Sequence, residues 1–167
     1  MNVTLETPRL ILREISANKD DLAAYLGWLR DTQNNSFIQS AKINYGLEEL
    51  VDFIEAINLD ANALLLGIFL VEEDKFIGTL KVQPIDFPDS TAWLGIMIGS
   101  PESRGLGYGR EALERVLSYL FNSLQIREVF LGVDLKNIPA ISLYKSLGFS
   151  EYKTEINSVV MRKTNIT

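Results

Sequence analysis

The sequence predicts an α+β (mixed α/β) fold, in which a central mixed sheet is flanked by helices. Three observations predict it: two apolar runs joined by a short polar turn, a strand–helix–strand unit late in the chain, and two amphipathic helical patterns near its start. The first is typical of an antiparallel hairpin, and the second should form a parallel, right-handed crossover. Because no linker, repeat or low-complexity segment interrupts the chain, residues 1–167 should form a single domain.

The first half of the chain supplies a strand, two helices and the hairpin. The segment RLILRE, residues 9–14, predicts a first strand after a proline. Apolar residues recur at helical spacing over 22–29 and again over 47–57, so a helix is expected in each place. The apolar runs 63–72 and 75–82, separated by the polar turn EED, then predict the hairpin.

The second half contains the parallel unit. Residues 91–99, TAWLGIMIG, predict a strand that is apolar on both faces, and such a strand is expected in the centre of a sheet. A helix with one apolar face should follow over 113–124, and residues 126–134 should return as a parallel strand. Asn137 can cap a last helix, which should end at Gly148. Two further runs, 149–153 and 156–163, predict closing strands.

Composition limits the chemistry that the chain can perform. A net charge of −6 argues against a nucleic-acid partner and weakly favours small cationic or amine partners. The chain has no cysteine and no histidine, which excludes a cysteine nucleophile, a Ser-His-Asp triad and the usual zinc sites. Acid–base chemistry must therefore use carboxylates, tyrosine, lysine, the amino terminus or water, and we expect no metal.

The sequence shows no sign of a membrane segment. Its longest apolar run, residues 63–71, is far shorter than the ~20 residues of a membrane helix. The first ten residues lack the basic and apolar regions of a secretory signal. We therefore expect a cytoplasmic protein without a membrane partner. Whether it forms a homodimer is left open.

Three glycines at alternate positions, within the stretch ESRGLGYGREAL, raise the question of a ligand. Gly105, Gly107 and Gly109 match neither the dinucleotide fingerprint G-x-G-x-x-G nor a nucleotide P-loop. Their backbone N–H groups should converge at a helix N-terminus, which is a phosphate site by the physics of unpaired donors. Arg104 and Arg110 could add positive charge there. The alternative is a tight strand-to-helix turn with no ligand.

The loop and two other segments carry a resemblance to a known family. RGLGYG fits the signature R/Q-x-x-G-x-G/A of the GNAT superfamily of N-acetyltransferases. NIPAISLYKSLGF, residues 137–149, is similar to the family's second hallmark, N-x-x-A-x-x-L-Y-x-x-x-G-F. TPRLILRE, residues 7–14, resembles the branch of ribosomal-protein N-terminal acetyltransferases. The resemblance covers essentially the whole chain. It implies the acyl-CoA N-acyltransferase fold and an enzyme that moves an acetyl group from acetyl-CoA to a primary amine by direct attack.

The resemblance also implies where the cosubstrate binds. The pyrophosphate would lie on the N–H groups of the glycine loop, and the pantetheine arm would pair like an extra strand with the strand before it. Asn137 corresponds to an asparagine that contacts the pantetheine arm or a water, although it could equally be only a helix cap. Tyr144 matches the tyrosine that protonates the departing thiolate; the alternative is a core tyrosine. The implied cofactor-binding residues are Ile96, Met97, Ile98, Arg104, Gly105, Leu106, Gly107, Tyr108, Gly109, Arg110 and Asn137, and the implied catalytic residues are Tyr144 and Asn137.

The family's general base does not transfer to this chain. Trp93 stands where many relatives carry a glutamate, and an indole cannot take a proton from an ammonium group. The remaining candidates are an ordered water or one of the carboxylates Asp86, Asp89, Glu6 and Glu14. Trp93 itself is expected to shape an acceptor pocket or to pack as core.

Two questions about function stay open at this stage. The acceptor is either a protein N-terminus, as the branch implies, or a nucleotide-linked amino sugar, because YLGWLRD (residues 25–31) looks like a segment of relatives that acetylate such sugars. The alternative to an enzyme is a non-catalytic acyl-CoA-binding regulatory module that kept the loop and lost the base. The preferred acyl chain is not specified by the sequence.

Overall fold

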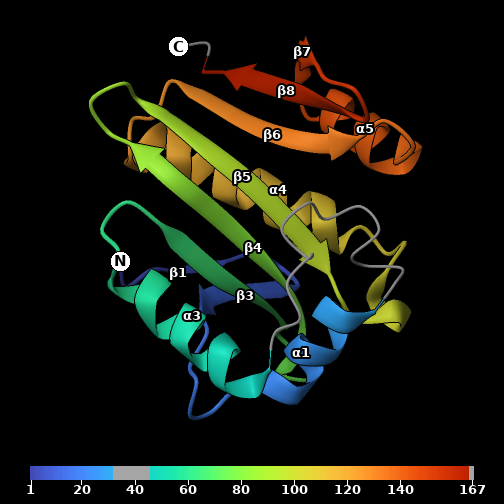
Figure 1. The fold of residues 1–167 in the computed structure, drawn as a ribbon. Helices are drawn as coiled ribbons and strands as arrows, with labels where there is room; N and C mark the ends of the chain where they lie inside the picture. The colour runs from blue at the N-terminus through green and yellow to red at the C-terminus, as the bar shows by residue number, and fades with distance from the viewer. Residues whose placement is uncertain (32–45, 166–167) are drawn as a thin grey trace.

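A single sheet organises the computed structural model, which describes residues 1–31 and 46–165 (Figure 1). The sheet has eight strands in the order β1-β2-β3-β4-β5-β6-β8-β7. In chain order the elements are β1 (Thr4–Glu6), β2 (Leu10–Glu14), α1 (Leu22–Arg30), α3 (Leu47–Leu59), β3 (Leu64–Leu70), β4 (Lys75–Asp86), β5 (Thr91–Ile98), a 3-10 turn (Pro101–Ser103), α4 (Tyr108–Ser118), a π-helical turn (Tyr119–Ser123), β6 (Glu128–Asp134), α5 (Ile138–Ser146), β7 (Ser150–Thr154) and β8 (Ser158–Thr164).

The sheet is mixed, as the sequence predicts. All neighbouring strands pair antiparallel except β5 and β6, which are parallel and are joined through α4. Strands β3 and β4 form the expected hairpin, with Leu64 paired to Val82 and Leu70 to Lys75. Strand β5 lies between β4 and β6, so its expected central position is confirmed.

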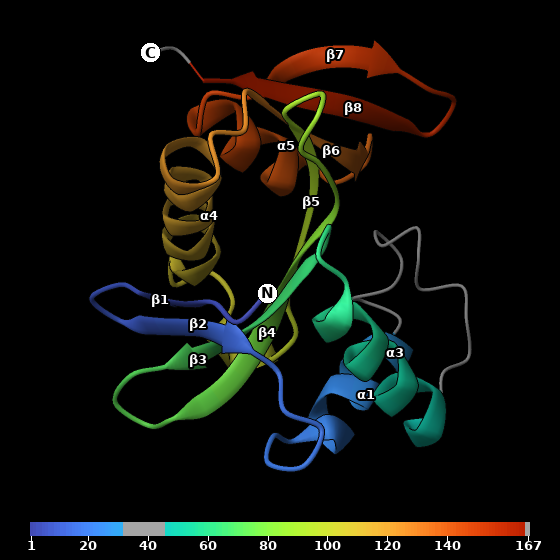
Figure 2. The same ribbon diagram turned by 90° about the vertical axis from the view of Figure 1, so that its left-hand side faces the viewer.

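Helices cover both faces of the sheet. Figure 2 shows α1 and α3 on one side and α4 and α5 on the other. Each side has its own apolar core. The core under α4 includes Leu113, Val116 and Leu120, which are fully buried against the sheet, and the core under α1 and α3 includes Leu50 and Ile54. Burying each of these side chains contributes about 1.5–3 kcal/mol, so the two cores hold the strands that carry the site.

Strand β1 is not expected from the sequence. Only residues 9–14 were expected to be extended at this end, whereas Thr4–Glu6 forms a second strand antiparallel to β2. Three residues are too few for a recognisable alternation of apolar and polar side chains. The strand forms because Leu5, paired with Leu12, is buried in the core.

The last helix begins and ends where the sequence predicts. The side-chain Oδ1 of Asn137 accepts a hydrogen bond from the Ala140 amide at 3.3 Å and caps α5. Gly148 has a φ of +96°, the left-handed conformation that favours glycine after a helix. None of the helices in the described part of the chain is long and apolar enough to cross a membrane.

Candidate active site

Strands β5 and β6 form a fork. They pair at three positions, the last of which joins Trp93 to Phe130. Beyond this rung β5 continues to Ile98, while β6 continues along β8 on its other side. No described strand pairs with the edge of β5 that faces β6 between Leu94 and Ile98. This edge therefore offers backbone donors and acceptors to an extended ligand, as strand addition requires.

The glycine loop lies at the open end of the fork, between β5 and α4. Gly105 and Gly107 have φ values of +73° and +86°, which disfavour residues with a Cβ. The first hydrogen bond into α4 runs from the Glu111 amide to the Gly107 carbonyl at 3.1 Å. Among the described residues, no acceptor bonds to the six amides of Gly105–Arg110. A run of unpaired N–H groups at the start of a helix binds anions, so the loop fits a pyrophosphate.

The Arg104 side chain bonds to the backbone at the end of β5. Its Nε donates to the carbonyl of Ile98 at 3.0 Å and its Nη2 to that of Gly99 at 3.2 Å. Its amide donates to the carbonyl of Pro101 at 3.2 Å, so the run of free amides begins one residue later. The guanidinium therefore ties the loop to the end of β5, where sequence reasoning assigned it to the ligand.

Arg110 bridges two helices. Its Nη1 lies 3.3 Å from Oε1 of Glu114, one turn further along α4, and its Nη2 donates to Oγ of Ser146 at the end of α5. The side chain is exposed, and its own amide is the last of the free donors in the loop. The Arg110 side chain thus links α4 to the end of α5.

Sequence reasoning missed Arg9, which lies against the loop from the other side. Its Nη1 donates to the carbonyl of Leu106 at 3.0 Å, and its guanidinium lies over the ring of Tyr108, 4.4 Å from the centroid. A Cβ on Gly107 would lie 3.3 Å from its Nη2. Arg9 therefore places a cation beside the predicted phosphate site. The contact spans about 100 residues of chain, and no local pattern signals it.

Glu111 anchors Arg9. The carboxylate accepts from Nε of Arg9 at 2.8 Å, from the Arg9 amide at 3.0 Å and from the hydroxyl of Thr7. Burial opposes ionisation of Glu111, but these hydrogen bonds outweigh it and lower the pKa of the carboxyl. The first turn of α4 is thereby fixed to the segment that precedes β2.

Tyr144 lies on α5 with its ring edge-on to Phe149, 6.0 Å between centroids. The side chain is largely enclosed, and burial raises the pKa of its hydroxyl to about 12. Tyr144 therefore keeps its proton at neutral pH, so its hydroxyl is available as a hydrogen-bond donor. Asn137, seven residues earlier, uses its side-chain oxygen to cap the helix, which leaves its amide nitrogen for another partner.

A row of aromatic rings begins at the fork. Trp93 is 39% exposed and stacks on Phe130, with 5.4 Å between the ring centroids. Phe130 meets the edge of Tyr152 at 5.3 Å, and Arg162 lies over Tyr152 at 4.7 Å. Trp93 alternates along β5 with Ala92 and therefore lies on the face of α1 and α3. It is neither a core residue nor a base.

The four carboxylates considered as bases lie elsewhere. Asp86 accepts the amide of Asp89 at 3.0 Å in the turn between β4 and β5, at the opposite end of β5 from the glycine loop. Glu14 pairs with the N-terminal ammonium at 3.5 Å, and Glu6 lies on the edge strand β1. None of the four lies along the free edge of β5.

The acceptor signal in residues 25–31 is explained by packing. Tyr25 and Trp28 are buried under α1 and meet the edge of Phe76 at 6.1 and 4.9 Å. A Cβ on Gly99 would lie only 2.0 Å from Trp28, so glycine at this position allows α1 to contact the end of β5. The segment therefore supports the core and gives no information on the acceptor.

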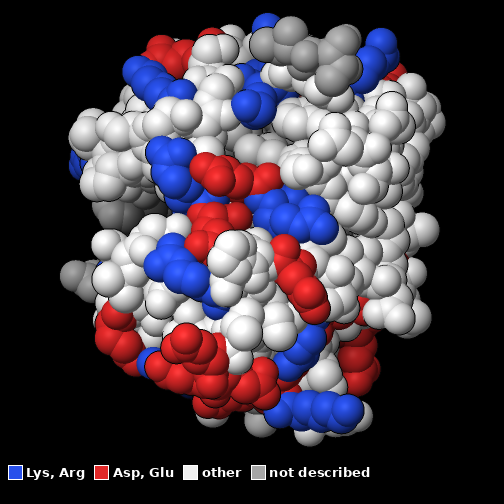
Figure 3. All heavy atoms as spheres, turned by 180° about the vertical axis from the view of Figure 1, so that it is seen from behind, with Lys and Arg blue, Asp and Glu red and all other residues white. Residues whose placement is uncertain are grey.

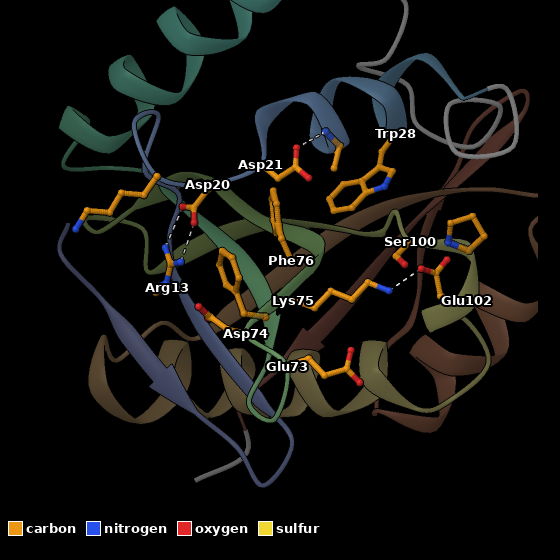
Figure 4. Close-up of a pocket in the computed structure, with 14 residues that line it drawn as sticks. Arg13, Asp20, Asp21, Trp28, Glu73, Asp74, Lys75, Phe76, Ser100 and Glu102 are labelled. Carbon is orange, nitrogen blue, oxygen red and sulfur yellow. Dashed lines mark hydrogen bonds and ion pairs between the residues drawn. The ribbon is translucent and has the colours of Figure 1, made fainter.

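A cavity of about 610 Å³ lies beside the start of α1 and the turn between β3 and β4 (Figure 4). Two ion pairs line it: Arg13 with Asp20 at 2.8 Å, and Lys75 with Glu102 at 2.6 Å. Its walls also carry the charged side chains of Lys19, Glu73 and Asp74. Ser100, Pro101 and Glu102, which follow β5, form one side of the cavity, and none of the residues implied by the resemblance lines it.

The surface over α4 carries charges of both signs. Figure 3 shows basic and acidic side chains interspersed on this face, without a continuous basic area. In residues 1–31 and 46–165, no group of His, Cys, Asp or Glu is arranged to hold a metal ion.

Comparison with known proteins identifies the family. Residues 9–150 match the family model described as the acetyltransferase (GNAT) domain. The uncharacterized N-acetyltransferase p20 of Bacillus licheniformis is 28% identical over 149 residues, which cover 89% of this chain and 83% of that protein. Spermidine N(1)-acetyltransferase of Vibrio cholerae is 28% identical over 128 residues, which cover 75% and 73%. The crystal structure of spermidine N-acetyltransferase from Vibrio cholerae with CoA and spermine has a TM-score of 0.84 at 21% identity, covering 95% of this chain and 96% of that one.

The chain belongs to the GNAT family of N-acetyltransferases. The expected acyltransferase fold and the expected membership of the GNAT superfamily are both confirmed. Enzymes of this family use acetyl-CoA, and one structural neighbour has CoA bound.

Proposed function

We propose that this enzyme transfers an acetyl group from acetyl-CoA to a primary amine by direct attack. The observation that supports the proposal is that two sets of backbone groups without hydrogen-bond partners among the described residues lie next to each other in the chain. One is the free edge of β5, and the other is the run of free amides in the loop that follows it. One accepts an extended arm and the other accepts an anion. Acyl-CoA has both features in one molecule, in the same order.

Different residues would bind different parts of the cosubstrate. The amides of Gly105–Arg110 would hold the pyrophosphate, with Arg9 beside them. The backbone of Ile96–Ile98 would pair with the pantetheine arm, and the side-chain nitrogen of Asn137 is free to reach it. Acetyl-CoA supplies the activated acyl group, whose thioester would lie toward the rung at Trp93. Positioning in this fork would account for most of the rate acceleration.

Tyr144 is the proposed donor to the departing sulfur. Its raised pKa keeps the hydroxyl protonated, although a pKa of about 12 lies above that of a thiol and makes full proton transfer uphill. A hydrogen bond that strengthens as charge develops on sulfur suits such a donor.

The acceptor is proposed to be a cationic amine. The net charge of −6 favours such a ligand, and one relative is the spermidine N(1)-acetyltransferase of Vibrio cholerae. A protein N-terminus and a nucleotide-linked amino sugar remain the alternatives. Because Trp93 replaces the usual glutamate, a non-catalytic acyl-CoA-binding module is the second candidate function. A homodimer also remains a proposal, which light scattering in solution tests.

Ligand binding and turnover together test the proposal. Acetyl-CoA and CoA should raise the melting temperature while ATP and NAD should not, and at 100 times Kd the linkage contributes about 2.7 kcal/mol. Release of the CoA thiol should then be followed with spermidine, a short peptide with a free N-terminus, and a nucleotide-linked amino sugar. An unchanged melting temperature in millimolar acetyl-CoA would contradict the proposed site. Binding without turnover of any amine would favour the non-catalytic module.

A further inference from the structure

Lys81 lies in the middle of β4, on the face of the sheet that α1 and α3 share with Trp93. It is paired with Leu65 on β3 and with Gly95 on β5. Its neighbours in the strand, Leu80 and Val82, point into the core under α4, so the Lys81 side chain points to the opposite face. The side chain is half-buried there.

No described residue pairs with the Lys81 ammonium through a hydrogen bond or an ion pair. A half-buried charge without a partner is unfavourable. Burial alone lowers the pKa of Lys81 from its ordinary value. The residues that the strand register and alternation place beside it do not ionise: Leu65 on β3, Thr79 and Gln83 on β4, and Trp93, Gly95 and Met97 on β5.

The space beside Lys81 is open toward β5. A Cβ built on Gly95 would meet no atom within 4 Å. Gly95 directly precedes Ile96–Ile98, whose backbone is the proposed partner of the pantetheine arm, and it follows Leu94, where the edge of β5 becomes free. The acyl end of the arm would therefore lie beside Gly95, and Lys81 is the nearest ionisable residue on the adjoining strand.

We propose that the amine of Lys81 is the general base that takes the proton from the acceptor ammonium, in the role for which Trp93 is unsuited. The inference rests on the proposed function. It adds a catalytic residue that no sequence motif indicates, because Lys81 is one of eight lysines in the chain and lies in a strand without a recognisable signature.

The proton balance is complete with this residue. Neutral Lys81 accepts one proton from the ammonium nitrogen of the acceptor, and that nitrogen then forms the bond to the acyl carbon while the carbon–sulfur bond breaks. Of the three protons on the original ammonium, one passes through Lys81 to solvent, one ends on the thiol and one stays on the amide. Tyr144 stabilises the charge that develops on sulfur through its hydrogen bond, and the second proton passes from the nitrogen to the thiolate through water.

Two substitutions distinguish a Lys81 that accepts a proton from a Lys81 that only supplies a positive charge. Lys81→Met keeps an unbranched apolar side chain and removes the amine, while Lys81→Arg keeps a cation that does not lose its proton. Lys19→Met, at an exposed site away from the fork, is the matched control. If Lys81 is the base, both Lys81 variants should lose kcat by at least ~10²-fold, with the KM for acetyl-CoA within a few-fold of wild type. The control should retain full activity.

Two readouts do not depend on turnover. Trace labelling of the eight lysines with acetic anhydride across pH, followed by mass spectrometry, should show Lys81 becoming reactive at lower pH than Lys19. Lys81→Met should also melt at higher temperature than wild type at pH 7. The folded state holds the Lys81 proton less tightly than the unfolded chain, whose pKa is 10.5. The gain should therefore be largest below the lowered pKa and vanish above pH 10.5.

The outcomes distinguish failure of the proposed function from failure of the proposed role of Lys81. A wild-type protein that binds acetyl-CoA but acetylates no amine would overturn the proposed function, and the role of Lys81 with it. An active wild type whose Lys81→Met variant keeps kcat within three-fold would overturn the role of Lys81 alone. Full activity in Lys81→Arg would show that the charge, not the loss of a proton, is what matters. Lys81 titrating together with Lys19 would equally exclude it as the base.

Discussion

Nε of Arg9, just before β2, donates to Oε1 of Glu111 in the first turn of α4 at 2.8 Å, across 102 residues of chain. The same carboxylate also accepts from the Arg9 amide and from Thr7, and Arg9 reaches on to the Leu106 carbonyl in the glycine loop. The loop that offers its amides to a phosphate is therefore fixed from outside by the N-terminal segment. Its conformation does not depend on the ligand alone.

We predict that Glu111→Gln weakens this anchor. Glutamine keeps the size of the side chain but removes the charge and one acceptor, so about 1–3 kcal/mol of stability should be lost. Acetyl-CoA affinity should fall by several-fold, because Arg9 and the loop lose their common support. Denaturant unfolding and isothermal titration measure both effects. A control is Glu114→Gln, whose partner Arg110 lies on the same helix and is exposed; it should change stability by less than ~0.5 kcal/mol.

The Glu111 carboxyl also makes the free energy of unfolding depend on pH in the acid range. Its folded pKa is depressed, so the stabilisation is present above the unfolded value of 4.5 and is lost as pH falls through the folded value. The stability difference between wild type and Glu111→Gln should therefore shrink below about pH 4.5. A difference that stays constant down to pH 3 would show that the charge of Glu111 contributes nothing.

A second prediction concerns Gly107, whose φ is +86°. Gly107→Val should destabilise the loop, because a β-branched residue disfavours this backbone conformation and its side chain would approach Arg9. We expect a folded protein with at least ~10-fold weaker binding of acetyl-CoA, the cost of about 1.4 kcal/mol. Gly27→Ala is the control: its Cβ meets nothing within 4 Å on α1, so binding should not change. Normal affinity in folded Gly107→Val would show that the loop is only a turn.

The local parts of the fold could be predicted because their signals are local. The hairpin, the amphipathic face of α4, and the helix cap at Asn137 each depend on residues within one or two turns of one another. Strand β1 was missed because it is stabilised by pairing with β2 and by burial of Leu5, not by its own pattern. The glycine loop was recognisable because positive φ restricts the residue type at Gly105 and Gly107.

The contacts that complete the site could not be predicted in this way. The sequence suggests Arg104 as a phosphate ligand, and in the fold its side chain bonds to the carbonyls of Ile98 and Gly99. These bonds form because the folded loop brings the guanidinium close to the end of β5. Arg9 reaches the loop only once β2 is docked on α4. Lys81 stands out only when the strand register places it beside Gly95 on β5. In each case the sequence specifies the residue, and the tertiary fold specifies its neighbour.

A third prediction concerns the aromatic row at the fork. Trp93→Ala removes the first ring, which is 39% exposed and stacks on Phe130. If this ring lines the acceptor pocket, the KM for the amine should rise by ~10-fold or more, the worth of one aromatic contact, while acetyl-CoA binding stays unchanged. Tyr152→Ala, at the far end of the row, should have a smaller effect. Equal acceptor KM values in wild type and Trp93→Ala would place the pocket elsewhere.

The last prediction tests Tyr144 as the donor to the leaving sulfur. Tyr144→Phe removes one hydroxyl and keeps the ring, so the edge-on contact with Phe149 should persist. Loss of the donor should lower kcat by at least ~10²-fold, with acetyl-CoA binding within a few-fold of wild type. Because burial raises the pKa of the hydroxyl to about 12, its ionisation cannot cause a fall in kcat below pH 10.

The same pKa sets the sign of a stability effect. Unfolded tyrosine ionises near pH 10 and folded Tyr144 near 12, so the folded protein should lose stability as pH rises through this window. Tyr144→Phe should lose less stability over the same range, since it has no proton to release. A variant that keeps kcat within a factor of three while showing this stability difference would make Tyr144 a buried core tyrosine, and solvent would then protonate the thiolate.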